Sequence, residues 1–189
     1  MYDTPRLLSR DFDAPTNVRA SRAPDSKPTS PYTAADIGIA EEQRKAVVRI
    51  LNTVLADEFL LYVKSRRFHW NVEGPDFVEL HELFQKHYEQ LGEVIDDVAE
   101  RARALDGVAA GSFEEYLELT RLTEEAAQRY DARDMIAALL ADHEALIRNL
   151  REDLRACSDR HGDEGTMDFL TGLMQVHEKM AWMLRVYLR

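Results

Sequence analysis

The segment from Phe77 to Leu105 carries apolar residues at an almost uninterrupted helical spacing, and this pattern limits the possible folds more than any other feature. Successive apolar positions are separated by three or four residues, and such spacing places their side chains on one face of an α-helix. The positions are Phe77, Leu80, Phe84, Tyr88, Leu91, Ile95, Val98, Ala102 and Leu105. Gly74-Pro75 ahead of the segment and Gly107 behind it predict where the helix begins and ends. The segment therefore predicts a long helix that buries a single seam.

Three further segments repeat this period, and none has the alternation of a strand. We expect long helices over about 37–68, 132–159 and 164–188. The expected buried positions of the first include Val47, Val48, Leu51, Val54, Leu55 and Phe59. A short helix is predicted to start at Ser112, because Ser112 and Glu115 have the spacing of a capping box. Four amphipathic helices predict an all-α four-helix bundle over 37–189, with the short helix in a long connection between the second and third helices.

Residues 1–36 differ in composition from the rest of the chain. They hold five of the six prolines and many serines and threonines, and they show no sustained period. We interpret them as a flexible, extended N-terminal tail. Their basic and acidic residues nearly cancel, whereas a tail that binds DNA strongly needs a clear excess of positive charge.

Charge and cysteine content exclude several classes of function. The formal net charge of −11 argues against a generally adhesive DNA-binding surface and suits a protein that handles cations. The single cysteine, Cys157, excludes a disulfide framework or a thiolate metal cluster within one chain. We see no apolar leader segment and no run of membrane-spanning length, so we expect a cytoplasmic protein without a membrane partner.

A polar row runs along the predicted helix 77–105 beside its apolar seam. Its members are His81, Gln85, Gly92, Asp96 and Glu100. Imidazole and carboxylate groups together suit iron, zinc or manganese. His81 and Asp96 are about 22 Å apart along a helix axis, however, whereas the ligands of one cation lie within roughly 2–2.5 Å of it. One helix therefore cannot assemble the site.

A second copy of the same helix removes this difficulty. The interval from His81 to Gln85 equals the interval from Asp96 to Glu100. If two copies pack antiparallel about a twofold axis near residues 90 and 91, His81 of one copy faces Glu100 of the other. Gln85 then faces Asp96 in the same way, and two identical metal sites form across the interface. On spacing alone, a structural histidine beside a solvated acidic face remains the alternative.

Several motifs resemble those of the Dps family of small ferritin-like proteins. They are Phe68-His69-Trp70-Asn71-Val72-Glu73-Gly74-Pro75-Asp76-Phe77, Leu80-His81-Glu82, Asp96-Asp97-Val98-Ala99-Glu100-Arg101, Asp142-His143-Glu144 and the segment 177–185. The resemblance covers about 40–189. It implies a ferritin-like bundle that assembles into a hollow homo-dodecamer, with ferroxidase sites at the twofold interfaces.

Carried over position by position, the resemblance implies a site divided between two chains. His69 and His81 are its ligands from one chain, and Asp96 and Glu100 come from the neighbour. The implied metal is iron, as a pair of ions or a single ion, with zinc as the alternative. The family's usual aspartate four residues after the second histidine is Gln85 here, so a neutral amide oxygen takes the place of a charged ligand.

The resemblance also implies roles for residues around the site. Trp70 is expected to lie beside the metal and to intercept stray oxidising equivalents, or else to anchor a helix end. His87 replaces the amide ligand only if the helix is locally distorted, because in a regular helix it points about 200° away. His143 and His177 match positions not assigned to iron, and we expect structural hydrogen bonds from both. The acidic connection around His161 is implied to line cation pores, or else is an ordinary solvated loop with a helix cap.

The implied activity is that of a ferroxidase and iron-storage protein that limits oxidative damage. Fe(II) enters through the acidic pores, gives electrons to hydrogen peroxide in preference to dioxygen, and is stored as a ferric mineral. Residues 1–36 supply no histidine, so we expect them to take no part in the oxidation. Two alternatives stay open: an architectural DNA-binding shell associated with the nucleoid, and a zinc-occupied site with slow iron turnover.

Overall fold

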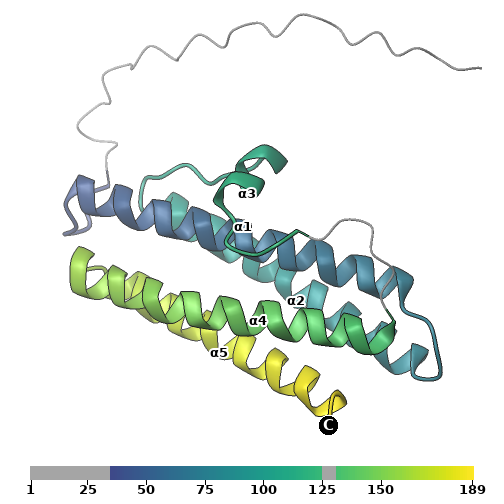
Figure 1. The fold of residues 1–189 in the computed structure, drawn as a ribbon. Coiled ribbons are helices and arrows are strands. Elements are labelled where there is room, and N and C mark those ends of the chain that lie inside the picture. The colour runs from purple at the N-terminus through teal and green to yellow at the C-terminus, as the bar shows by residue number, and fades with distance from the viewer. Residues whose placement is uncertain (1–34, 125–130) are drawn as a thin grey trace, which may run out of the picture. The chain divides into compact units, whose positions relative to one another are not determined.

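The computed structural model describes residues 35–124 and 131–189. In these ranges the chain forms helices and no strand, as predicted (Figure 1). The elements are α1 (Glu41–Asn71), α2 (Phe77–Ala104), α3 (Phe113–Leu119), α4 (Ala132–Arg155), a π-helical turn η1 (Ala156–Arg160) and α5 (Glu164–Tyr187). The predicted tail, except for its last two residues, lies outside the described part of the chain. None of the helices within that part is both long enough and apolar enough to span a membrane.

Two helical hairpins make up the bundle. α1 packs mainly against α2, and α4 packs mainly against α5, with α1 also contacting α3 and α4. The predicted seam of α2 supplies much of the core, since Leu80, Phe84, Leu91, Val98 and Ala102 are all buried. Leucines of α1, α4 and α5 complete the same core. Burial of such side chains stabilises by about 1.5–3 kcal/mol each, so the seam fixes which face of α2 points inward.

A few side chains predicted to be buried are more exposed in the structure. Phe59 is half-buried, because its outer side is covered only by the short α3, where its ring stacks on Tyr116 at 4.4 Å. Phe77 is 43% exposed, because it is the first residue of α2 and lies beyond the end of the core. Tyr88 and Ile95 lie at the edge of the seam and are half-buried.

Helix ends also differ from the prediction by a few residues. α1 begins at Glu41 rather than near residue 37, and it continues to Asn71. Pro75 lies in the turn before α2 rather than in its first turn, and the helix begins at Phe77. The capping box of α3 is confirmed, because the Ser112 hydroxyl accepts from the Glu115 N–H while the Glu115 carboxylate accepts from the Ser112 N–H.

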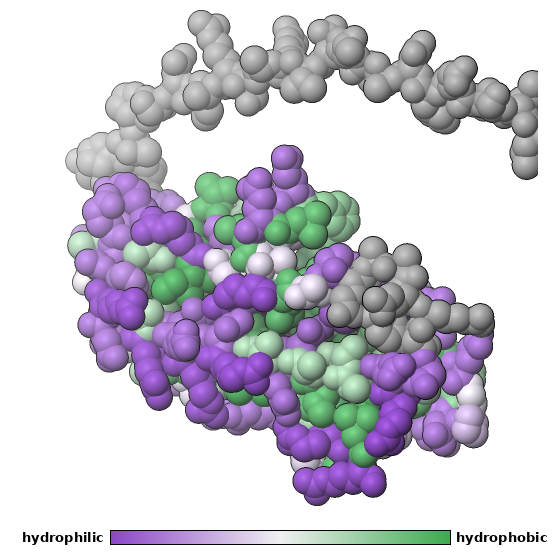
Figure 2. All heavy atoms as spheres, in the orientation of Figure 1, coloured by the Kyte–Doolittle hydropathy of each residue, from purple (hydrophilic) through white to green (hydrophobic). Residues whose placement is uncertain are grey.

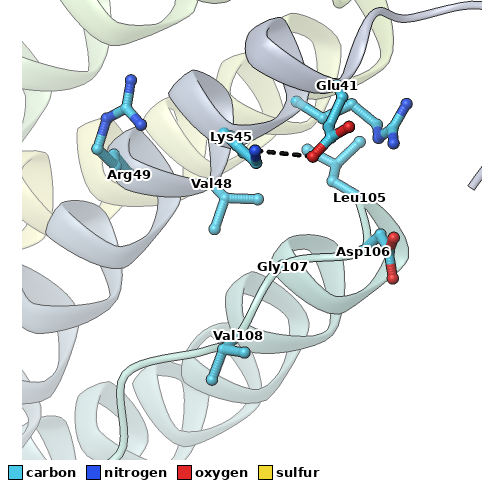
Figure 3. Close-up of a pocket in the computed structure, with 9 residues that line it drawn as sticks. Glu41, Lys45, Val48, Arg49, Leu105, Asp106, Gly107 and Val108 are labelled. Atoms are coloured by element: carbon cyan, nitrogen blue, oxygen red, sulfur yellow. Dashed lines mark ion pairs between the residues drawn. The ribbon is translucent and has the colours of Figure 1, made fainter. Parts of the chain in front are cut away.

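The far end of α2 lies close against α1, and Gly107 makes this approach possible. A Cβ atom at Gly107 would lie 2.5 Å from both methyl carbons of Val48, which is far inside van der Waals contact. Figure 3 shows this region, where Gly107 and Val48 line a pocket of about 290 Å³ beside the Glu41–Lys45 ion pair. No histidine lines this pocket, so it is separate from the residues predicted to bind metal.

Buried Asp57 anchors the connection between α2 and α4. Its carboxylate is fully buried on α1 and accepts hydrogen bonds from the Arg121 backbone N–H, the Arg121 Nε and the Thr120 hydroxyl, at 2.6, 2.8 and 2.9 Å. The Arg121 guanidinium also pairs with Asp153 on α4 at 2.8 Å. One arginine therefore ties the connection to two helices of the bundle.

This arrangement predicts a large effect of Arg121 on stability. Arg121→Met should lower the free energy of unfolding by about 3 kcal/mol, because it leaves the buried Asp57 charge without its cation. Lys45→Met is the matched control, since Lys45 pairs with Glu41 at the solvent-exposed surface. The control should unfold at the same temperature as the parent in circular dichroism melting. Equal melting temperatures for all three proteins would refute the anchoring role.

Candidate metal centre

His69 and His81 lie ring against ring where α1 and α2 meet. His69 is in the last turn of α1, and His81 is in the second turn of α2. Their ring centroids are 3.7 Å apart and the ring planes differ by 24°. The two histidines that sequence analysis assigned to one chain's share of the site are thus brought together by the fold.

Two reciprocal hydrogen bonds fix the tautomers of this pair. The Nδ1 of His69 is 2.9 Å from the backbone oxygen of His81, and the Nδ1 of His81 is 2.9 Å from the backbone oxygen of His69. A carbonyl oxygen can only accept, so each Nδ1 carries a proton and donates it. Each Nε2 then keeps its lone pair, which is the form that binds a cation. The hairpin backbone itself therefore holds both imidazoles in the tautomer that can bind a cation.

The turn between the two helices explains this local geometry. Val72 leaves α1 in an extended conformation, and Gly74 follows with φ +118°. That φ lies in a region that residues with a Cβ rarely adopt, so glycine is required to close the turn. Pro75 then leads the chain into α2. The sequence Val-Glu-Gly-Pro thus returns the chain with His81 level with His69.

Gln85 lies one turn beyond His81 on α2 and is half-buried. Its side-chain NH2 donates to the Glu89 carboxylate at 2.7 Å. This hydrogen bond uses the nitrogen of the amide, so the amide oxygen is still available as a neutral metal ligand.

Asp96 and Glu100 are exposed to solvent near the other end of α2. Asp96 is about 22 Å from His81 along the helix axis. Among the residues that the structure describes, no three His, Cys, Asp or Glu side chains are arranged to hold one cation. A single chain therefore unites His69 with His81 but leaves both carboxylates far from them.

The aromatic surroundings of the histidine pair include a residue that sequence analysis did not assign to the site. The Tyr88 ring lies edge-on to His69, with centroids 5.2 Å apart. The Arg66 guanidinium covers Tyr88 at 4.6 Å and lies 5.5 Å from the Trp70 ring. Trp70 is 66% exposed. A side chain that anchors a helix end is expected to be buried, so the single chain does not support the anchor role for Trp70. The sequence places Tyr88 in the apolar seam of α2. Its spacing of seven residues from His81 is the signal that could have placed it beside the histidine pair.

His87 lies in the bundle core instead of beside Gln85. It is 3% exposed, and its ring is 5.6 Å from His143 in an edge-to-face arrangement. α2 is a regular helix at this point, so the local distortion that the His87 alternative requires is absent from it. His87 therefore does not replace the amide ligand in this structure.

The acidic residues after α4 fall into two groups, one buried aspartate and several exposed carboxylates. Asp163 is buried, caps α5 by accepting from the Thr166 N–H at 2.8 Å, and pairs with Arg101 of α2 at 3.0 Å. It is a structural cap rather than part of a pore lining. Asp159, Glu164 and Asp168 stay exposed. His161 lies with its Nδ1 2.6 Å from the Gln43 side-chain oxygen, which joins the connection to α1.

Comparison with known proteins agrees with this fold. Residues 48–189 match the ferritin-like domain family. The chain is 50% identical over 153 residues to an uncharacterized low temperature-induced protein of Nostoc, covering 81% of this chain and 86% of the relative. It is 38% identical to DNA protection during starvation protein 2 of Bacillus anthracis, covering 76% of this chain and 97% of that protein.

A solved structure gives the same result in three dimensions. The crystal structure of the Dps protein of Vibrio cholerae superposes with a TM-score of 0.77 at 31% sequence identity, covering 82% of this chain and 97% of that one. Both the sequence matches and the fold therefore extend over the whole bundle. The chain belongs to the Dps family of ferritin-like proteins.

Proposed function

We propose that this protein oxidises Fe(II) at sites shared between two subunits and stores the ferric product inside a hollow oligomer. The reciprocal hydrogen bonds between His69 and His81 are the observation that carries this proposal. They hold both Nε2 atoms in the ligating form before any cation arrives, so little reorganisation is needed on binding.

The stacking distance supports a pair of iron ions. The ring centroids of His69 and His81 are 3.7 Å apart, and the ions of two-metal sites are about 3.5–4 Å apart, so the two imidazoles are close enough to serve neighbouring ions. Each histidine then serves one Fe(II). Two Fe(II) ions supply the two electrons that, with two protons, reduce hydrogen peroxide to two water molecules. We infer that hydrogen peroxide is preferred to dioxygen because two ions at one site match its two-electron reduction.

The carboxylates of a second subunit complete the site in this proposal. Asp96 and Glu100 are one turn apart and solvent-exposed, so an antiparallel copy of α2 can cover them. Their charge offsets that of the bound iron, which the neutral imidazoles and the Gln85 amide cannot do.

Exposed apolar side chains support subunit contacts. Large hydrophobic residues lie at the surface of α1, α2, α3 and α5, and Figure 2 shows apolar patches on one face of the bundle. They include Val63, Trp70, Phe77, Val78, Phe113, Leu117, Trp182 and Val186. Apolar surface of this extent is typical of a protein that buries it against other subunits.

We expect these contacts to produce a closed homo-dodecamer. Sedimentation velocity should then give one species near 260 kDa, about twelve times the 21.7 kDa of one chain. A stable monomer or an isolated dimer at micromolar concentration would contradict the hollow shell.

Subunit mixing tests how the site is divided between chains. His81→Ala and Glu100→Ala should each slow iron oxidation at least about tenfold, because even outer-shell changes at metal sites commonly cost that much. When the two variants exchange subunits, an interface with one chain of each kind has one intact site and one that lacks both ligands. Random mixing at equal amounts should therefore restore about a quarter of the parental rate, measured by ferric absorbance.

A matched mixture provides the control. His69→Ala and His81→Ala alter the same half of the site, so each site at their mixed interfaces still lacks one histidine. That mixture should recover no activity. Recovery in both mixtures, or in neither despite verified subunit exchange, would refute the antiparallel pairing.

Replacement of Gln85 tests whether its neutral amide limits iron binding. Gln85→Asp adds an anionic ligand and should tighten Fe(II) binding about tenfold, equivalent to ~1.4 kcal/mol. Gln85→Asn is the control, since it shortens the side chain without adding charge. Metal analysis after aerobic loading with both iron and zinc checks the result. If the parent retains zinc and forms no ferric core, the site is a zinc site with slow iron turnover.

DNA protection is the second candidate function. Several relatives are named DNA protection during starvation proteins, which favours it. The net charge of −11 argues against direct binding to the DNA backbone by the bundle surface. We therefore propose that any protection of DNA by this chain arises through removal of Fe(II) and peroxide.

A further inference from the structure

A second group of metal-binding side chains lies in the centre of the bundle. Each of the four long helices contributes one member: Glu58 from α1, His87 from α2, His143 from α4 and His177 from α5. His87 is 3% exposed, and the other three are fully buried. Glu58 is eleven residues before His69, or roughly 16 Å along α1, so this core cluster is distinct from the His69–His81 pair.

Part of the core cluster is joined by a short chain of hydrogen bonds. The His177 Nε2 is 2.8 Å from the Glu58 Oε1, and the His177 Nδ1 is 2.9 Å from the His143 Nδ1. Only one of the two Nδ1 atoms can carry the proton of their shared hydrogen bond. When His177 donates its Nε2–H to the carboxylate, its Nδ1 is left with a lone pair.

The remaining polar atoms of the core cluster have no hydrogen-bond partner within residues 35–124 and 131–189. They are the Glu58 Oε2, both ring nitrogens of His87 and the His143 Nε2. Each such buried atom destabilises the fold if it stays unsatisfied. Four in one cluster are more than a structural hydrogen-bond network explains, and they point to a bound ligand.

The spacing of the rings favours a cation as that ligand. His143 and His177 have centroids 5.2 Å apart, and His87 and His143 have centroids 5.6 Å apart. Imidazoles that share one tetrahedral cation, with each nitrogen about 2.1 Å from it, have centroids roughly 5 Å apart. A carboxylate on the other nitrogen of a ligating histidine, as Glu58 is on His177, is the usual outer partner of such a site.

We propose that His87, His143 and His177 bind one transition-metal cation inside each bundle, with Glu58 orienting His177. Among the described residues, no three donors already converge on one point. Binding therefore requires the hydrogen bond between the two Nδ1 atoms to break, so that the imidazoles can turn toward the cation. Three imidazoles without a thiolate select zinc, iron(II) or cobalt(II) over magnesium and calcium. The fully buried position makes entry and release slow, because the core must open locally.

The protonation state of the core agrees with this assignment. Burial, with the neighbouring His177 and His87 imidazoles, holds the pKa of His143 well below its usual value. His143 is therefore neutral near pH 7, as a ligating imidazole must be.

The test uses the full-length assembled protein in a His69→Ala/His81→Ala background, which removes the interfacial histidines. Four of the six histidines then remain, three of them in the core cluster and the fourth, His161, near the surface. After prolonged incubation with zinc and passage over a chelating resin, about one zinc per chain should be retained. X-ray absorption at the zinc edge should show the scattering of two or more imidazoles.

Two further variants in the same background show whether the retained zinc is bound by the core cluster or elsewhere in the protein. His143→Leu fills the core with an apolar side chain and should lose the retained zinc. His161→Ala is the matched control and should keep it. Equal zinc in the parent and the His143→Leu variant would overturn the proposal, as would retention of no zinc, which points to bound water.

A failure of the His143→Leu variant to assemble still leaves the proposal open to refutation. In that case the X-ray absorption spectrum of the parent decides, and fewer than two imidazole ligands on its zinc overturns the core site. Because the background lacks His69 and His81, a negative result here says nothing against iron oxidation at the interface.

Discussion

The antiparallel packing of α2 against α1 is the constraint on which the bundle and the metal centre both depend. The seam of α2 must face the core, and this fixes the rotation of the helix about its axis. The turn at Gly74 fixes its register against α1. With rotation and register set, His81 must lie level with His69, and Asp96 and Glu100 must face outward. The placement of both proposed half-sites therefore follows from burial of apolar side chains.

The same rotation divides the histidines of the chain into two environments. His69 and His81 lie where α1 and α2 meet at the turn, and backbone carbonyls accept their Nδ1 protons. His87 lies six residues after His81 and so on a different face of α2, toward α4 and α5. The hydrogen bonds of the core histidines His143 and His177 run to side chains instead of to backbone carbonyls. The two groups thus have different means of fixing their tautomers.

Sequence reasoning succeeded where one segment determines the structure and fell short where segments far apart meet. The α2 seam and the α3 capping box are local patterns, and the structure confirms both. The direction of His87 away from Gln85 also followed from helical geometry. That His87 meets His143 and His177 could not be predicted, because the register of α4 and α5 against α2 depends on the packing of the whole core. The proximity of Tyr88 to His69 depends in the same way on the register of α2 against α1, although the seven-residue spacing from His81 does place Tyr88 on the same face of α2.

The cost of burying charge explains why Asp96 and Glu100 lie apart from His69 and His81 in the single chain. A lone buried carboxylate is costly, and Asp57 is buried only together with Arg121. Asp96 and Glu100 remain solvated in the single chain, so folding of the monomer does not desolvate them. In the proposed oligomer, these carboxylates lose their water only on assembly, when a second subunit covers them and bound cations balance their charge. In the proposed oligomer, metal binding and subunit association therefore stabilise one another, since each lowers the electrostatic cost of the other.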